Sequence, residues 1–374
     1  MTKVVFLIRS LGTGGTERQL ATLLPRLNKD RFDVTVMVFY AGGRFASELA
    51  ANKVHVVCLD KRGRWDLVGF LWRLVTELRR LRPGILHSYL VEPNLIAVLI
   101  KPLFRSTRIV WGIRASNVDL KKYDWFARFN FRLQIFLSGV PDLIIFNSIA
   151  GRDHHFAGGS AQKRTVVIHP GIDTEQFKSD RQLGQTLRKE WGVRDETVLI
   201  GLVGRLDPMK GYPVFFQAAS RLARGSTDCH FVIAGNGPPE YRAILCRLVE
   251  ASDLTQRITW VGSHTDMPAV YNALDIACMS SLFGEGLPNA IAEAMACGVP
   301  GVVTDVGDAA LLVGDTGLVV PPNDPQALAD GLAKCVRMLH NGELHDPRRR
   351  IQENFGVAKL ANQTEAALLA LTQN

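Results

Sequence analysis

The sequence of 374 residues contains no run of about 18 uncharged apolar residues, the length that a membrane-spanning helix needs. It also has no low-complexity tract and no repeat at the spacing of solenoid proteins. Its first residues, MTKVVFLIRSLG, include only about six apolar residues before Arg9, and a glycine-rich turn follows where a secretory signal would have its cleavage site. We therefore expect that this is not a transmembrane, repeat or secreted protein.

Cysteine is scarce, and the spacings that bind metals are missing. None of the six cysteines forms a C-x-x-C pair, and most fall in apolar strand or helix patterns. No D-x-D pair and no His/Cys cluster with ligand spacing stands at a predicted strand end. The sequence therefore predicts reduced, buried thiols in a cytosolic protein and no metal site. The cysteines are Cys58, Cys229, Cys246, Cys278, Cys297 and Cys335.

The charge is divided unevenly along the chain. Residues 1–170 hold 26 Lys and Arg against 12 Asp and Glu, whereas the remainder holds 18 against 24, which together give the net charge of +8. A basic first half indicates an anionic partner for that half. Nucleic acid is disfavoured because no recognition motif accompanies the charge. A membrane surface and a phosphorylated acceptor both remain open.

The chain is long enough for two domains, and its patterns favour an α/β fold. Apolar, β-branched runs alternate with helical patterns in both halves, which is typical of a parallel sheet with helices on both faces. We predict two doubly wound domains over 1–172 and 178–354, with a periodicity break in Pro170–Asp180. A last helix in 355–374 is expected to pack back on the first domain. Ligands of such sheets bind at the carboxyl ends of the strands, so two facing domains would place the site in the cleft between them. The predicted strands are Lys3–Arg9, Phe32–Tyr40, Val54–Leu59, Ile85–Ser88, Thr107–Gly112, Asp142–Asn147, Thr165–His169, Thr197–Gly204, His230–Ala234, Ile258–Val261, Asp275–Met279 and Gly301–Thr304; the predicted helices are Thr16–Asn28, Trp65–Arg82, Val91–Phe104, Tyr123–Ser138, Pro213–Ala223, Glu240–Ala251, Leu287–Cys297, Pro325–Leu339 and Gly356–Leu371, with a Pro- and Arg-rich turn at His345–Arg350.

The stretch SLFGEGLPNAIAEAMACGVP, from Ser280 to Pro300, carries the strongest functional signal. Pro288 suits the first helical position, which places Glu285 in the preceding loop and Glu293 on the second turn. The free N–H groups of the first turn favour phosphate, and carboxylates on both sides suit the hydroxyls of a sugar nucleotide. The alternative is a surface helix with two solvated glutamates, but the flanking Gly, Pro and apolar residues favour a buried loop.

Three further loops follow predicted strands. Gly14 and Gly15 lie in a glycine-rich turn that would bring backbone amides close to a phosphate, with Thr16 as the helix cap. The turn lacks the dinucleotide spacing G-x-G-x-x-G because Glu17 stands where the last glycine is needed. A tight structural turn is the alternative.

The other two loops lie in the second half. In VGRLDPMKG, Arg205 and Lys210 would neutralise a diphosphate, unless the segment is simply a solvated basic loop. In FVIAGNGPPE, the turn with Gly235 and Asn236 gives a flat backbone wall for a base or a ribose, or forms a plain strand-to-helix turn.

Together these segments resemble the retaining glycosyltransferases of family 4, which have the GT-B fold of two Rossmann-like domains. The resemblance covers most of the chain and depends on the order and spacing of its motifs. These are GTGGTE near the start, FNS at Phe146–Ser148, VVIHPGID at Val166–Asp173 with Phe177, VGRLDPMKG, AGNGP, the E-G-x-P…E-A-M-A-x-G block with Glu285 and Glu293 eight residues apart, and VGDTGLVVPPNDPQALA from Val313.

The resemblance implies a role for each matching residue. Arg205 and Lys210 would bind the donor diphosphate, Glu285 the hydroxyls of the donor sugar, and Glu293 the ribose hydroxyls. The resemblance names Glu285, Arg205 and Lys210 as catalytic; the full donor-binding set is Gly14, Gly15, Arg205, Lys210, Gly235, Asn236, Gly286, Leu287 and Glu293. Such enzymes retain the anomeric configuration, need no divalent metal and use no cofactor, since the nucleotide sugar is a substrate.

One departure concerns the acceptor side. Many relatives have a histidine at the end of the strand that here reads IVWGIRASN, where Arg114 or a neighbour stands. A fixed cation in place of a titratable ring affects the donor sugar and the acceptor chemistry, though not the reaction class. His87 also lies at a predicted strand end and would face the cleft, or else is a structural histidine.

The run KKYDWFARFNFRLQIFLSG, from Lys121 to Gly139, mixes aromatic with basic residues. Lys121, Lys122, Trp125 and Phe126 are our candidates for contact with an anionic membrane surface. The alternative is that these aromatics pack in the core.

The sequence thus predicts a metal-independent glycosyltransferase that is peripheral on the inner face of the plasma membrane of a bacterium. It would move a hexose or N-acetylhexosamine from a nucleoside diphosphate, UDP being favoured, to a hydroxyl of a polyprenyl-diphosphate-linked glycan in surface polysaccharide or lipopolysaccharide synthesis. The alternatives are another GT-B activity, such as a sugar-nucleotide epimerase or phosphorylase, and a catalytically silent scaffold of a polysaccharide assembly complex.

Overall fold

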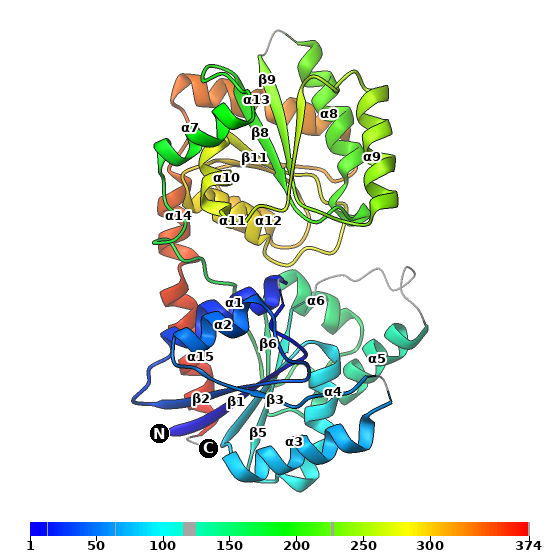
Figure 1. Ribbon diagram of the computed structural model, residues 1–374, viewed down its shortest axis with the longest axis vertical. Helices are drawn as coiled ribbons and strands as arrows, with labels where there is room; N and C mark the ends of the chain where they lie inside the picture. The colour runs from blue at the N-terminus through cyan, green and yellow to red at the C-terminus, as the bar shows by residue number, and fades with distance from the viewer. Residues whose placement is uncertain (13, 64, 115–124, 226–227, 373–374) are drawn as a thin grey trace. The chain divides into compact units, whose positions relative to one another are not determined.

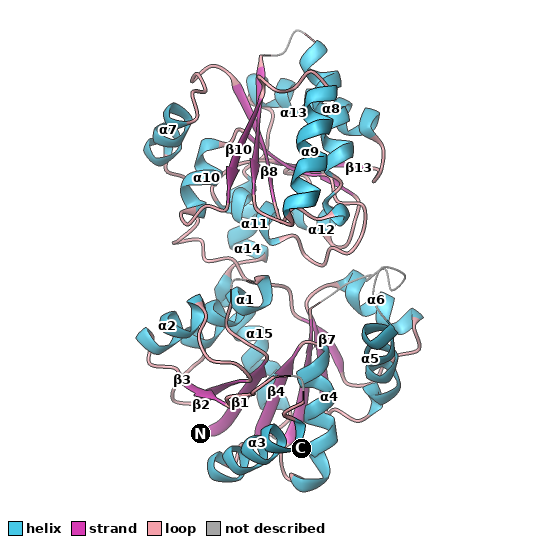
Figure 2. Cartoon of the chain, turned by 45° about the vertical axis from the view of Figure 1, so that its right-hand side comes forward, coloured by secondary structure: helices cyan, strands magenta, loops and turns pink. Residues whose placement is uncertain are grey.

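A computed structural model describes residues 1–12, 14–63, 65–114, 125–225 and 228–372. The chain forms two compact units, which we call unit 1 (Met1–Gly171 and Val357–Asn374) and unit 2 (Ile172–Gly356). The chain therefore leaves unit 1 once and returns to it for its last helix (Figure 1). Each unit is a parallel sheet with helices on both faces (Figure 2), which confirms the predicted α/β, doubly wound class.

The sheet of unit 1 has seven parallel strands in the order β3-β2-β1-β4-β5-β6-β7. The order changes direction between β1 and β4, and ligands of doubly wound sheets bind at this point, outside the carboxyl ends of the strands. The strands are β1 (Thr2–Ile8), β2 (Phe32–Val38), β3 (His55–Cys58), β4 (Ile85–Tyr89), β5 (Arg108–Ile113), β6 (Leu143–Phe146) and β7 (Thr165–Val167).

Two helical layers cover this sheet. One layer contains α1, α2 and α15, and the other contains α3 and α4. Each layer buries apolar side chains against one face of the sheet. In the first layer α15 lies beside α1 and contributes Leu360 and Leu368 to the core of unit 1 (Figure 1). The helices are α1 (Gly15–Leu23), α2 (Arg44–Ala51), α3 (Leu67–Leu81), α4 (Val91–Ile100), α5 (Trp125–Phe136), α6 (Ile149–Ala157) and α15 (Val357–Ala370), with short 3-10 turns η1 (Leu24–Arg26), η2 (Lys101–Leu103) and η4 (Leu137–Gly139).

The sheet of unit 2 has six parallel strands in the order β10-β9-β8-β11-β12-β13. Its order changes direction between β8 and β11, so the loops after these two strands lie where a ligand is expected. The strands are β8 (Val198–Val203), β9 (Cys229–Ala234), β10 (Ile258–Gly262), β11 (Ile276–Met279), β12 (Gly301–Thr304) and β13 (Leu318–Val320).

The helices of unit 2 also form two layers. One core joins the sheet to α8, α9 and α13, and the other joins it to α7, α10, α11, α12 and α14. The bounds are α7 (Arg181–Glu190), η5 (Pro208–Lys210), α8 (Tyr212–Arg224), α9 (Pro239–Ala251), α10 (Met267–Ala273), α11 (Asn289–Ala296), α12 (Ala309–Val313), α13 (Pro325–Asn341) and α14 (Pro347–Asn354).

Two sequence predictions need correction here. The Pro- and Arg-rich segment predicted as a turn is the helix α14, because Asp346 accepts hydrogen bonds from the amides of Arg348 and Arg349 and Pro347 occupies the first helical position. All six cysteines are free thiols, but only four are buried, since Cys58 and Cys246 are partly exposed.

Candidate active site

Two loops of unit 2 meet where the strand order changes direction. One follows β8 and ends at Gly211, and the other follows β11 and begins at Ser280. Gly211 has φ +66°, and a Cβ atom there would lie 2.0 Å from the carbonyl oxygen of Ser280, so only glycine allows this approach. The Ser280 hydroxyl donates to the carbonyl of Lys210 at 2.8 Å. The amide of Leu282 also donates to the Met209 carbonyl at 2.7 Å, so backbone and side-chain hydrogen bonds together hold the two loops.

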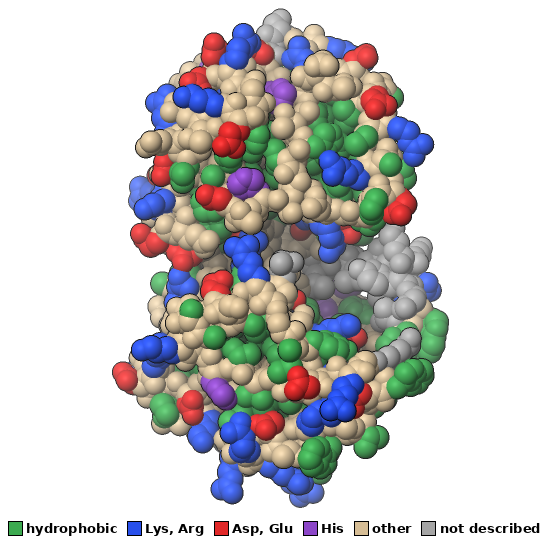
Figure 3. All heavy atoms as spheres, viewed as in Figure 1, with side chains coloured by type: hydrophobic (Ala, Val, Ile, Leu, Met, Phe, Trp, Pro, Cys, Tyr) green, Lys and Arg blue, Asp and Glu red, His purple; other side chains and the backbone are tan. Residues whose placement is uncertain are grey.

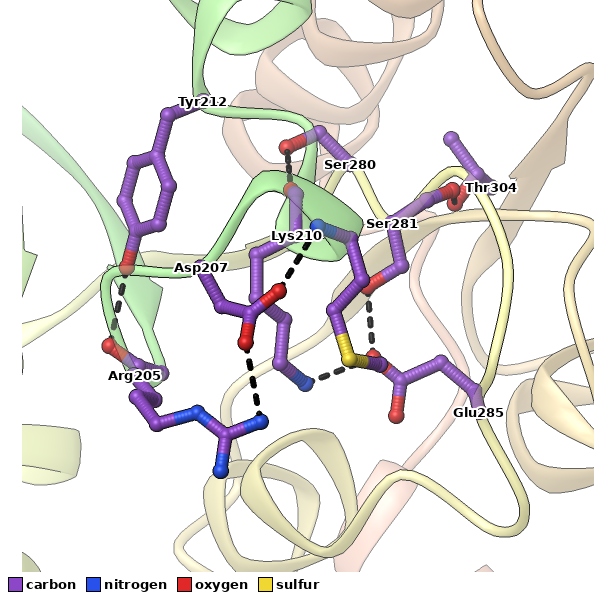
Figure 4. A network of polar contacts seen from close by, with 10 residues as sticks. Arg205, Asp207, Lys210, Tyr212, Ser280, Ser281, Glu285 and Thr304 are labelled. Atoms are coloured by element: carbon purple, nitrogen blue, oxygen red, sulfur yellow. Dashed lines mark hydrogen bonds and ion pairs between the residues drawn. The ribbon is translucent and has the colours of Figure 1, made fainter. Parts of the chain in front are cut away.

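An ion pair between a partly buried lysine and a buried glutamate joins the same loops. Lys210 Nζ lies 2.6 Å from Glu285 Oε1, and the two side chains are only 21% and 9% exposed. The Ser281 hydroxyl donates to the same carboxylate oxygen at 2.5 Å, and the Thr304 hydroxyl donates to the Ser281 carbonyl at 2.7 Å (Figure 4). A buried charge needs such partners to offset its lost hydration. Lys210 and Glu285, which the sequence assigns to one site, are in direct contact.

Arg205 is placed differently from Lys210. Its side chain is 67% exposed, and its guanidinium pairs with Asp207 Oδ2 at 3.0 Å (Figure 4). The other oxygen of Asp207 accepts the amide of Met209 at 3.0 Å, which caps η5. The Tyr212 hydroxyl donates to the Gly204 carbonyl at 2.8 Å, and burial raises the pKa of this tyrosine, which keeps it a donor. The loop therefore has a fixed backbone from which Arg205 extends into solvent.

Glu293 lies on α11, whose first turn follows the Glu285 loop. It is 2% exposed, and its Oε2 accepts a hydrogen bond from the hydroxyl of Tyr271 at 2.7 Å. This burial contradicts the alternative of a solvated surface glutamate. Pro288 is the N-cap of α11 with φ −75° and ψ 98°, and helical geometry begins only at Asn289. This corrects the prediction that Pro288 is the first helical residue.

The remaining donor-side candidates of unit 2 flank these loops. Gly235, after β9, has φ +148°, and a Cβ atom there would lie 1.9 Å from the Gly204 carbonyl oxygen. Asn236 donates to the Ser263 hydroxyl at 3.0 Å. The carbonyl of Gly286 accepts the amide of Asp308 at 2.9 Å, and Leu287 is 4% exposed. The loops after β8, β9 and β11 thus form one edge of the unit 2 sheet.

The candidates of unit 1 lie at the carboxyl edge of its sheet. Gly14 is the N-cap of α1 and Gly15 is its first residue, so Thr16 lies inside the helix and does not cap it as predicted. Arg114 follows β5 directly, and its guanidinium carbon lies 4.7 Å from the centroid of the Tyr89 ring. This stacking gives the cation a defined position at the strand end.

His87 is not the strand-end residue that the sequence predicts. It lies in the middle of β4 and is fully buried, with its ring 5.2 Å from that of Phe6 and 4.5 Å from that of Tyr89. Neither ring nitrogen has a hydrogen-bond partner among the residues that the structure describes. Burial, and then the nearby Arg114 charge, hold the pKa of His87 well below its usual range. His87 is therefore a neutral core residue in this structure, with no contact to solvent.

Four of the five aromatic residues of α5 point outward, and the fifth, Phe131, packs on His155. Trp125, Phe126, Phe129 and Phe136 are 75%, 41%, 55% and 82% exposed, so they do not pack in the core. Hydrophobic and basic side chains stand next to one another on the surface of unit 1 (Figure 3). Lys121 and Lys122, predicted to accompany them, lie outside the described residues. Across the described ranges, we find no helix that combines the length and apolar character needed to cross a bilayer.

Sequence reasoning missed three residues of this site: Asp207, Ser281 and Tyr271. Asp207 and Ser281 follow parallel strands closely, which is a signal that could have identified them. Tyr271 lies on α10, a seven-residue helix that the sequence did not predict. In the part of the chain that the structure describes, no group of three or more His, Cys, Asp or Glu side chains is placed to hold a metal ion.

Comparison with protein families matches both halves of the chain. Residues 197–338 match the family described as "Glycosyl transferases group 1", and residues 13–176 match "Glycosyltransferase Family 4".

Curated relatives agree with this assignment. An N-acetylgalactosamine-N,N'-diacetylbacillosaminyl-diphospho-undecaprenol 4-alpha-N-acetylgalactosaminyltransferase of Campylobacter jejuni is 27% identical over 343 residues, covering 89% of each chain. The alpha-D-kanosaminyltransferase of Streptomyces kanamyceticus is 35% identical over 189 residues, covering 49% of this chain and 46% of that one.

Solved structures show the same fold. The Anabaena protein Alr3699/HepE, in complex with UDP and glucose, superposes with a TM-score of 0.85 at 21% identity and covers 99% of this chain and 100% of its own. Sucrose-phosphate synthase of Thermosynechococcus elongatus superposes with a TM-score of 0.81 at 18% identity over the full length of both chains. The fold is that of the GT-B glycosyltransferases. The chain belongs to the group 1 glycosyltransferases, as its sequence motifs predict.

Proposed function

We propose that this protein is a retaining, metal-independent glycosyltransferase that uses a nucleoside-diphosphate sugar, with UDP as the favoured nucleotide. The observation that carries the proposal is the largely buried Lys210–Glu285 pair at the edge of the unit 2 sheet, with the buried carboxylate of Glu293 on the helix that follows. This arrangement provides a cation for a diphosphate and two carboxylates for hydroxyl groups. A nucleotide sugar presents diphosphate between two sets of hydroxyls.

Each charged residue has a distinct part in this proposal. Lys210 would turn from Glu285 to the diphosphate oxygens, and Arg205, already exposed, would contact them from solvent. Glu285, released from the lysine, would accept hydrogen bonds from the donor sugar while Ser281 still holds it. Glu293 would accept bonds from the ribose. Positive charge at the leaving diphosphate stabilises the transition state more than the ground state, which is what accelerates transfer.

The loop geometry supports backbone contacts to the same ligand. Gly286 and Leu287 precede α11, whose first amides point toward the loop, and Gly235 and Asn236 end the neighbouring strand. Gly14 and Gly15 would supply amides from unit 1. The structure of the Anabaena protein named above is a complex with UDP and glucose, which is consistent with UDP as the favoured nucleotide.

For the acceptor, we propose a hydroxyl of a polyprenyl-diphosphate-linked glycan at the cytoplasmic face of the membrane. The Campylobacter relative is named for a diphospho-undecaprenol substrate. The exposed aromatic residues of α5, from Trp125 to Phe136, suit an anionic membrane surface. Aromatic side chains enter the membrane interface, and neighbouring basic side chains attract anionic lipid. Arg114, fixed on Tyr89, would contact the acceptor side. We propose no nucleic-acid partner, because no recognition motif accompanies the basic charge of the first half.

The experiment that tests this function is a donor screen with purified protein. UDP- and GDP-linked hexoses and N-acetylhexosamines are each incubated with a polyprenyl-diphosphate-linked saccharide, and the released nucleoside diphosphate and the anomeric configuration of the product are measured. Release that requires the acceptor, with retained configuration, supports the proposal. Release without acceptor, an epimerised donor or no turnover with any donor would contradict it. An inverted product would contradict the retaining mechanism alone.

A further inference from the structure

The carboxylate of Glu293 has an unusual environment for a group that meets a soluble ligand. Only 2% of the residue is exposed, and Tyr271, which donates to its Oε2 at 2.7 Å, is itself 1% exposed. A phenol that donates to a carboxylate in a buried site forms a strong hydrogen bond, since one partner is ionised and little water competes. The bond therefore fixes the rotation of the carboxylate.

Burial, and then the Glu293 charge, raise the pKa of the Cys297 thiol to about 12. Cys297 follows α11 directly, one helical turn after Glu293. An ionised carboxylate accepts hydrogen bonds only, at about four positions around its two oxygens. The hydroxyl of Tyr271 occupies one of these positions, on Oε2.

Tyr271 is itself held by the segment through which the chain enters unit 2. Its ring lies 6.0 Å from that of Phe177 at an angle of 60°, and Phe177 is 5% exposed. The Phe177 carbonyl accepts a bond from Arg348 at 2.8 Å, and the same guanidinium nitrogen donates to the carbonyl of Ala296, the last residue of α11. The segment at Phe177 thus contacts the ring of Tyr271 directly, and it is linked through Arg348 to the end of the helix that carries Glu293.

We propose that Tyr271 is the positioning residue for the ribose-binding carboxylate, which makes it a determinant of selectivity for nucleotides that carry intact ribose hydroxyls. Tyr271 does not touch the nucleotide. It orients Glu293 so that the carboxylate meets the 2′- and 3′-hydroxyls. This inference rests on the function proposed above.

The test compares two probes on two proteins. The affinity of wild type and of Tyr271→Phe is measured by calorimetry for UDP, or for GDP if the donor screen selects it, and for the matching 2′,3′-dideoxynucleoside diphosphate. Phenylalanine keeps the ring that packs on Phe177 and removes only the donor. We expect Tyr271→Phe to bind the normal nucleotide about tenfold more weakly, and the dideoxy nucleotide as wild type does within about twofold.

Two further variants separate positioning from general damage. Glu293→Gln should show the same selective loss, and the double variant should lose no more than Glu293→Gln alone, because both changes remove one coupled unit. Tyr241→Phe is the matched control, since this tyrosine packs against the other core of unit 2. If Tyr271→Phe does not fold, the pairing is tested with Glu293→Gln and with Phe177→Leu, which loosens the ring while keeping the phenol.

The outcomes distinguish the two levels of the proposal. If wild type binds no nucleoside diphosphate, the proposed function fails and the inference fails with it. If wild type binds UDP or GDP but Tyr271→Phe binds both forms of the nucleotide with unchanged affinity, or loses both equally, only the positioning role is overturned. Additive losses in the double variant would also overturn it.

Discussion

Lys210 and Glu285 neutralise each other across two loops, with 2.6 Å between Nζ and Oε1. The pair lies where the strand order of unit 2 changes direction, which is the position at which such sheets bind ligands. Each residue therefore has its charge balanced within the protein, and in the proposed function each would turn to a ligand group. Stability and activity should respond differently when one of the two is removed.

For stability, we predict that Lys210→Ala lowers the free energy of unfolding by about 1–3 kcal/mol, because the buried carboxylate of Glu285 loses its cation and keeps the hydroxyl of Ser281 as donor. The double variant Lys210→Ala with Glu285→Gln should recover part of this loss, since no unpaired charge remains. Urea unfolding of the wild type, the two single variants and the double variant measures the coupling. Purely additive changes would mean that the pair contributes nothing to the fold.

For activity, we predict that Lys210→Ala and Arg205→Ala each reduce kcat/KM about a hundredfold, because each removes positive charge from the leaving diphosphate. Arg205 is an exposed side chain, so Arg205→Ala should unfold as the wild type does. Arg221→Ala is the control, since this exposed arginine lies on α8 and donates a hydrogen bond to the Gln217 carbonyl of the same helix. Wild-type turnover in Arg205→Ala would show that the diphosphate is held by other groups.

Transfer should continue in EDTA. Lys210, Arg205 and the first turn of α11 would carry the charge that a divalent cation balances in other transferases. Initial rates are measured after dialysis against EDTA, and again with added magnesium or manganese. A complete loss of turnover that either metal restores would contradict the metal-free mechanism.

Membrane binding should depend on the outward face of α5. The protein is expected to sediment with vesicles rich in anionic lipid, and less so as salt rises, because salt screens the attraction. Replacing Trp125 and Phe126 with Ser should weaken binding even at low salt, whereas replacing Lys121 and Lys122 with Glu should weaken it mainly at low salt. The matched control replaces Ile244 and Leu311, exposed apolar residues of unit 2, with Ser. If the α5 variants bind as the control does, the lipid-linked acceptor loses its main structural support.

Acid should destabilise unit 1 through His155, a residue of α6 that packs on Phe131 and Phe146. Burial, and then the charge of His154, lower the pKa of His155 to about 4 from the unfolded value of 6.5. At pH values between these two pKa values, the unfolded chain binds more protons than the folded one. The free energy of unfolding therefore decreases as the pH is lowered, by about 2 kcal/mol from pH 7 to pH 5. His155→Phe should remove that part of the pH dependence in urea unfolding. An unchanged slope would mean that His155 is already protonated in the fold.

The sequence predicted most strands because parallel strands buried on both faces are continuous apolar runs. It also predicted the neighbourhood of Lys210 and Glu285, since the carboxyl ends of parallel strands meet at one edge. It missed α2, α6, α7, α10 and α12, which have only five to ten residues each. Periodicity over two turns is too weak to separate such helices from loops.

Other features depend on tertiary contacts that no local pattern encodes. The sequence predicts that this strand stops at Ser88, which places His87 near its end. In the structure Tyr89 also pairs with Gly112, so the strand is one residue longer and His87 lies in its middle. The exposure of Trp125 and Phe126 was equally undecided, because an aromatic stripe looks the same whether it faces a core or a membrane. The hydrogen bond from Tyr271 to Glu293 joins residues from two helices, and only the fold brings them together.

The return of α15 to unit 1 has a consequence for biosynthesis. The seven strands of unit 1 are complete once β7 has been made, yet Leu360 and Leu368 of its core, and Glu365, which accepts the amide of Asn28 at 2.7 Å, are translated only after all of unit 2. Domains generally fold during synthesis in N-terminal order. Here the first domain would wait on the ribosome with an uncovered apolar face while the second one folds. A stop codon just after unit 2 would therefore damage the domain encoded first, and a chaperone that shields nascent chains would be needed mainly for unit 1.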